Sequence, residues 1–213
     1  MDVLDKLKND WQKNGDRYPR ISEHEIYGML HKKSSSIVKW ILLISIMEFA
    51  FFLTISLLLS DNPNSEKMES YIPSALNICI WVLDMGINVC FMYLFFVNYR
   101  KITNTDNIKN LMASILRARK IVSRYIMIKL IVMFVIAFIS LVYLHDNDPK
   151  WLEIFQHAQE KGKGFVVNLM YYGIGVIAIS LLVVFFWLFY KLIYGVLLKR
   201  LYRNYQELKK IEI

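Results

Sequence analysis

The chain alternates between charged segments and four long apolar segments, which cover residues 37–59, 75–97, 126–144 and 165–190. A helix needs about 20 apolar residues to cross a hydrocarbon core about 30 Å thick. The apolar residues are clumped rather than periodic, which is typical of helices surrounded by lipid. The pattern predicts an all-α polytopic membrane protein with four transmembrane helices and cytoplasmic helical extensions.

Lysine and arginine side chains follow the same alternation. Residues 1–36 hold seven, 98–125 seven and 191–213 six, whereas 60–74 hold one and 145–164 three. Cationic side chains stay on the cytoplasmic side during insertion, so we expect a four-pass protein of the bacterial inner membrane with both termini in the cytoplasm. The first 36 residues are highly charged and no small-residue cleavage site follows the first apolar segment, so we expect no cleavable signal peptide.

Composition adds two exclusions. The chain is 56% hydrophobic with a net charge of +8, and the positive-inside bias with contact to anionic lipid explains this charge without nucleic acid. Cys79 and Cys90 lie eleven residues apart on one predicted helix, about 16 Å along its axis. This separation is too long for a disulfide, and we expect both to be buried apolar residues.

The cytoplasmic segments are expected to form amphipathic helices. Residues 1–36 read as a helical pair, the second beginning with a capping box from Ser22 to Glu25. A further helix is expected over 106–124 within the 37–190 bundle, after the cap-forming residues at 103–107, either on the lipid surface or packed on other helices. No proline occurs from 165 to 212, so 191–213 is expected to extend the fourth span. Apolar stripes on the helical pair are candidate partner-binding residues: Val3, Leu4, Leu7, Trp11, Ile26, Met29 and Leu30.

Two carboxylates inside predicted spans are the sharpest chemical signal. Glu48 lies near the middle of span one and Asp84 within span two, where Asn77 and Asn88 continue a polar stripe. A charge at mid-bilayer costs about 2.5 to 3.5 kcal/mol. Two interpretations stay open: a proton or cation relay, or hydrogen bonding between helices with at least one acid neutral. In the second, the expected donors are Asn77, Asn88, Ser45, Asn168, Tyr171 or Tyr172.

Enzyme chemistry finds little support in the sequence. The four histidines divide between the two sides of the membrane, and no pair has the i, i+3 or i, i+4 spacing for a shared metal on one helix. We therefore expect no catalytic residues, no metal and no cofactor. In span four, Gly173, Gly175 and Ala178 form a small-residue patch for packing within the bundle or between copies.

Three stretches carry a family resemblance: Leu-Lys-Asn-Asp-Trp at 7–11, Tyr-Pro-Arg-Ile-Ser at 18–22, and the run at 25–41. They resemble the opening of a largely uncharacterised family of small four-span inner-membrane proteins from Bacteroidota. Some members are encoded beside extracytoplasmic-function sigma factors, which implies a membrane anti-sigma role.

The leading hypothesis is a non-enzymatic regulator whose cytoplasmic helices bind a soluble protein, with an extracytoplasmic-function sigma factor as the expected partner. Two alternatives remain. One is a small proton-linked transporter or channel using Glu48 and Asp84. The other is a membrane subunit or assembly factor of a larger complex, with a homo-oligomer as a further form of assembly.

Overall fold

The computed structural model describes residues 22–60, 70–105 and 107–211, and every regular element in these ranges is a helix. The predicted helix over residues 2–14 lies outside the described residues. The fold class is confirmed as all-α, with the bounds α2 (Glu23–Ser60), α4 (Ser74–Thr103), α5 (Ile108–Asn147), α6 (Pro149–Glu160) and α7 (Gly164–Ile211).

Local capping explains where three of these helices begin. The backbone amide of Glu25 donates to Ser22 Oγ at 3.2 Å, and the amide of Ser22 donates to Glu25 Oε2 at 2.9 Å. This confirms the predicted capping box. The side chains of Asn107 and Asp148 accept from the amides of Lys109 and Lys150 in the same way, so α5 and α6 begin at residues that satisfy free amides.

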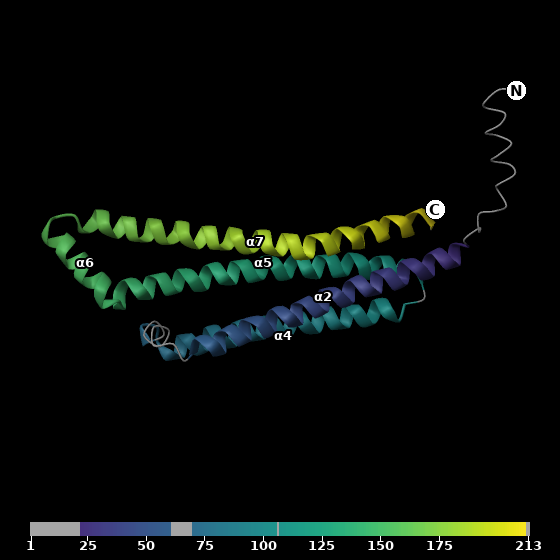
Figure 1. Cartoon of the computed structure of the whole chain (residues 1–213), viewed down its shortest axis with the longest axis horizontal. Helices are drawn as coiled ribbons and strands as arrows, with labels where there is room; N and C mark the ends of the chain where they lie inside the picture. Colours follow the sequence, from purple (N-terminus) through teal and green to yellow (C-terminus); the bar gives the residue numbers. More distant parts are fainter. Residues whose placement is uncertain (1–21, 61–69, 106, 212–213) are drawn as a thin grey trace, which may run out of the picture.

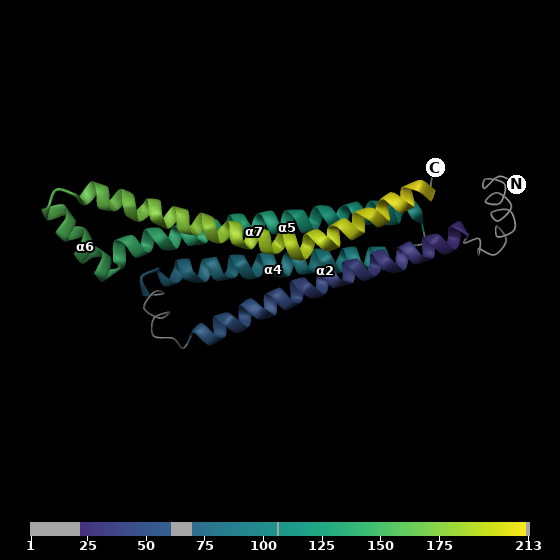
Figure 2. The same ribbon diagram turned by 45° about the horizontal axis from the view of Figure 1, so that its top comes forward.

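The four long helices run side by side and form a single elongated bundle (Figure 1). They contain 38, 30, 40 and 48 residues. At the end of the bundle that carries α6 the helices diverge, and toward the end where α2 begins and α7 ends they draw together (Figure 2). We call these the apolar end and the basic end.

The core lies mostly toward the basic end. Aliphatic and aromatic residues from all four long helices are almost completely buried there, and these have less than 2% of their surface exposed: Val38, Ile41, Phe95, Ile102, Leu111, Ile115, Val122, Tyr125, Tyr194, Leu201 and Leu208. The predicted stripes of 106–124 and 191–213 therefore pack against other helices of this chain. Packing within the bundle replaces the alternative in which 106–124 lies on lipid.

The apolar end is covered by exposed hydrophobic side chains rather than by other helices. All four long helices are long and apolar enough to cross a membrane. A soluble protein rarely exposes so continuous an apolar surface, so the surface fits contact with lipid. Cys79 and Cys90 are both exposed on α4, which corrects the expectation that they are buried, because their side of α4 faces outward.

Helix α6 covers the far edge of the apolar end, where it joins α5 to α7 (Figure 1). The ring of His145 lies between those of Trp151, Tyr171 and Tyr172, with centroid distances of 5.7, 5.2 and 5.1 Å. Gly162 has a φ of 69° in the turn that follows, a left-handed conformation that glycine adopts without a steric penalty. Aromatic contacts thus anchor α6 to the ends of α5 and α7.

The helices run unbroken from the apolar to the basic end. The expected boundary between residues 36 and 37 falls inside α2, and the boundary between 190 and 191 falls inside α7. Ser34 is fully buried within this continuous helix. The parts that the sequence assigns to the membrane and to the cytoplasm are therefore formed by the same four long helices.

The small-residue patch of α7 is divided by the packing. A Cβ on Gly175 would lie 2.6 Å from Leu141 Cδ2 of α5, whereas a Cβ on Gly173 would meet nothing within 4 Å. Ala178 is exposed. Gly175 alone of the three permits a close approach of two helices within this chain, so the interpretation of a patch between copies stays a prediction for Gly173 and Ala178.

Candidate functional site

Glu48 of α2 lies among three phenols from two other helices. Its Oε1 accepts from the hydroxyl of Tyr125 on α5 at 3.0 Å and from the hydroxyl of Tyr190 on α7. Its Oε2 accepts from Tyr194 at 3.3 Å. The three tyrosines are themselves buried, with 5% or less of their surface exposed. One carboxyl group therefore links three helices through hydrogen bonds.

Asp84 of α4 forms a second polar cluster. Its Oδ1 accepts from Lys129 Nζ of α5 at 2.8 Å, and its Oδ2 accepts from Asn88 Nδ2 at 3.0 Å. The ion pair compensates a charge that would otherwise face apolar side chains. Asn77, the outermost member of the predicted polar stripe, lies in the first turn of α4, about 10 Å along the axis from Asp84.

The two clusters form one polar layer across the bundle. Tyr190 connects them, because it donates to Glu48 and also lines a cavity together with Asp84. Two basic residues, Arg124 and Lys191, directly adjoin Tyr125 and Tyr190 in the sequence, and such residues mark the headgroup region. The layer thus lies level with the start of the third apolar segment and the end of the fourth, while Glu48 itself is central in the first.

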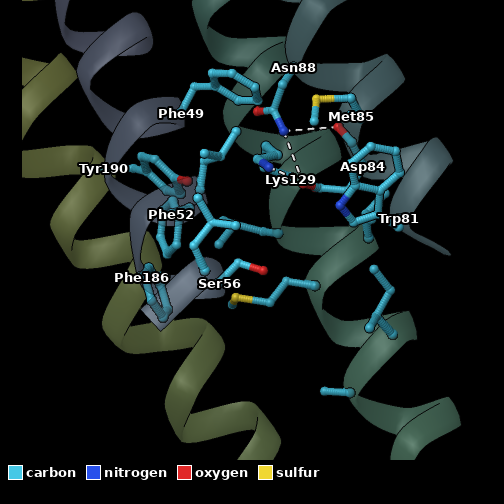
Figure 3. A pocket seen from close by; sticks show the side chains of 17 residues that line it. Phe49, Phe52, Ser56, Trp81, Asp84, Met85, Asn88, Lys129, Phe186 and Tyr190 are labelled. Carbon is cyan, nitrogen blue, oxygen red and sulfur yellow. Dashed lines mark hydrogen bonds and ion pairs between the residues drawn. The ribbon is translucent and has the colours of Figure 1, made fainter. Parts of the chain in front are cut away.

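A cavity of about 540 Å³ opens on the apolar side of this layer, between α2, α4, α5 and α7 (Figure 3). Its polar wall contains Asp84, Asn88 and Lys129, and Figure 3 shows these three joined by the ion pair and hydrogen bonds. Its remaining walls are mainly aromatic and aliphatic. The volume lies within the range of about 300–1,000 Å³ of small-molecule sites.

The polar groups at the cavity supply charge and hydrogen bonds. Within the described ranges, no three His, Cys, Asp or Glu side chains gather closely enough to hold a metal ion. Glu48 does not line the cavity, and its oxygens accept from tyrosines rather than from Asn or Ser residues. The relay interpretation, in which Glu48 and Asp84 exchange a proton, stays a prediction.

The expected partner-binding residues divide into three groups. Leu30 is 5% exposed and belongs to the core, Ile26 packs partly against that core, and Met29 is 54% exposed. The other four residues, Val3, Leu4, Leu7 and Trp11, lie outside the described residues. The structure therefore leaves Met29, and not Leu30, as a surface residue available to another protein.

Sequence reasoning missed the side chains that hold the two carboxylates. In the sequence, Tyr125 resembles one more apolar residue after the 106–124 helix, and Lys129 resembles a basic anchor near the end of a span. Tyr190 and Tyr194 lie at i, i+4 spacing, which places two hydroxyls on one face of a helix. That spacing at the end of an apolar span was the signal that could have identified them.

Comparison with known proteins adds one positive finding. No curated protein and no solved structure matches the chain significantly. One family model matches residues 24–213, which include all five helices from their first turns onward. The match leaves out the N-terminal stretch that holds Val3, Leu4, Leu7 and Trp11. The chain belongs to the family described as a domain of unknown function, DUF8845.

Proposed function

We propose that this protein is a non-enzymatic regulator in the bacterial inner membrane, in which four spans anchor a cytoplasmic helical bundle that binds a soluble protein. In its most specific form the proposal makes the protein an anti-sigma factor, with an extracytoplasmic-function sigma factor as the partner. The resemblance of residues 7–41 to the Bacteroidota family supports this form.

One observation carries the proposal: each long helix continues from the lipid-facing end into a closely packed bundle at the basic end. Ile41, Tyr125 and Tyr194 are almost fully buried near the polar layer, and Leu111 and Leu208 are fully buried farther along. A membrane anchor needs no such extension, since about 20 residues cross the bilayer. Rigid helices that pass through both environments are suited to carrying a change from one to the other.

The apolar residues left for a partner are those that the bundle does not already bury. Because Leu30, Leu201 and Leu208 pack within the chain, a soluble partner must use other apolar residues. The sequence offers them in the N-terminal stretch, where Val3, Leu4, Leu7 and Trp11 share one helical face. Tryptophan is enriched among residues that dominate binding energy, so we assign Trp11 the central contact.

The orientation is tested with reporter fusions. A reporter active only in the periplasm, fused after Ile213, should be inactive, because the sequence segments 1–36, 98–125 and 191–213 hold 20 of the 26 lysine and arginine residues and are expected to stay in the cytoplasm. The same reporter inserted into the 60–74 loop should be active. An active fusion at Ile213 would contradict the proposed topology.

Partner capture is tested by crosslinking in the native membrane followed by purification. Trp11→Ala should reduce the yield of the crosslinked cytoplasmic protein by at least tenfold, since it removes the largest apolar contact of the stripe. Trp40→Ala is the matched control, because Trp40 is 55% exposed on α2, at the start of the first apolar segment. Equal capture by the two variants would refute the binding surface, and a partner other than a sigma factor would refute the anti-sigma form.

A further inference from the structure

We propose that the cavity beside the polar layer is a binding site for a lipophilic cation, a molecule with one positive charge and apolar substituents. The proposal does not depend on a cytoplasmic partner. It adds a small-molecule site to a chain whose proposed function concerns protein binding.

We infer the sign of the ligand's charge from the polar group that is more exposed at the cavity. The side chain of Asp84 is 44% exposed, whereas that of Lys129 is 14% exposed. A molecule entering the cavity therefore meets the carboxylate before it meets the ammonium. Lys129 and Asn88 each use one oxygen of Asp84, and a carboxylate accepts about four hydrogen bonds in all, so Asp84 retains capacity to face a cation.

The wider layer reinforces this sign. Asp84 and Glu48 bring two carboxylates to the layer, and Lys129 brings one ammonium, so these three groups carry a net charge of −1 when all are ionised. The donors around Glu48 are neutral phenols, which stabilise the anion without balancing its charge. Coulomb interactions act strongly in such apolar surroundings, and they favour a cation over an anion in the cavity.

The walls of the cavity suit the apolar part of such a ligand. Trp81 lies beside Asp84, and Phe49, Phe52 and Phe186 line the opposite side of the cavity, as Figure 3 shows. Aromatic faces attract cations by about 0.5 to 2 kcal/mol, and they also contact apolar groups. Trp81 is 60% exposed and lies at the side of the cavity next to Asp84, on the outward face of α4, where a ligand could enter from the bilayer.

The test compares two probes of the same shape and opposite charge, tetraphenylphosphonium and tetraphenylborate. Equilibrium dialysis against the purified full chain in dodecylmaltoside micelles should show one saturable site for tetraphenylphosphonium. The double variant Asp84→Asn, Lys129→Met removes the carboxylate that faces the cavity, leaves the net charge of the three groups at −1 through Glu48, and should weaken that binding at least tenfold if contact with Asp84 selects the cation. Asn77→Ala, a polar change on the same helix outside the cavity, should leave it unchanged.

A second variant separates a loss of binding from a loss of folding. Trp81→Ala changes an exposed side chain, keeps the ion pair, and should weaken tetraphenylphosphonium binding about threefold to tenfold. Binding of tetraphenylborate as tight as that of tetraphenylphosphonium would overturn the proposal, because it would show that the charge of Asp84 does not select the ligand. Unchanged binding in both the double variant and Trp81→Ala would overturn the location of the site.

Discussion

Glu48→Ala is expected to lower the free energy of unfolding by about 3 kcal/mol or more. Glu48 accepts hydrogen bonds from Tyr125, Tyr190 and Tyr194, which come from two other helices. Each buried donor left without an acceptor costs about 1–3 kcal/mol, and all three phenols lose theirs at once. Unfolding in mixed micelles with increasing sodium dodecyl sulfate, followed by circular dichroism, measures the change.

A graded series identifies the cause of this loss. Tyr125→Phe removes one donor and should cost about 1 kcal/mol. Glu48→Gln keeps an acceptor oxygen and should fall between Tyr125→Phe and Glu48→Ala. Leu192→Ala is the control, because Leu192 is 72% exposed on α7. If Glu48→Ala is no more destabilising than Leu192→Ala, the three hydrogen bonds do not hold the helices together.

The secondary structure followed from local signals. The capping box at Ser22, the cap cluster that ends at Asn107, and the absence of proline after 164 predicted the first turns of α2 and α5 and the length of α7. Such signals depend on residues within one or two turns of each other, so a single sequence contains them. The apolar segments likewise predicted four helices able to span a membrane.

The partners of Glu48 could not be predicted because they depend on the rotation of each helix about its axis. Donors were expected among Asn77, Asn88, Ser45, Asn168, Tyr171 and Tyr172. Of these, Asn88 does bind a carboxylate, that of Asp84, while Tyr171 donates to the carbonyl of Leu141 at the apolar end. Rotation is set by the packing of residues far apart in the sequence, such as Phe95 on Tyr125.

The partner of Asp84 could have been predicted from the sequence. Helices α4 and α5 are joined by a short turn between Thr103 and Ile108, and an antiparallel hairpin brings together residues equally far from its turn. Asp84 lies 19 residues before Thr103, which places it level with residue 127, and Lys129 is two residues farther. Locating the turn was enough to pair these two charges.

The apolar stripes show a different limit of sequence reasoning. A helix with one apolar face must cover it, but the pattern is the same whether the cover is another helix of the chain or a separate protein. Leu30 and Leu201 have packed against other helices of the bundle. Met29 has not, and the predicted stripe at Val3 to Trp11 lies in the part of the chain that the family match leaves out.

Lys129→Met is expected to destabilise the protein by about 3 kcal/mol, the cost of an uncompensated charge among apolar groups in a membrane. The change leaves the carboxylate of Asp84 beside the cavity with Asn88 as its remaining side-chain donor. Adding Asp84→Asn removes the charge itself and should recover most of the loss, because replacing both partners of an apolar ion pair is often nearly neutral. The same unfolding experiment on both single variants and the double variant gives the coupling energy of the pair. Additive effects, with no recovery in the double variant, would mean that lipid or water already compensates Asp84, and the carboxylate would then be too well solvated to select a cation.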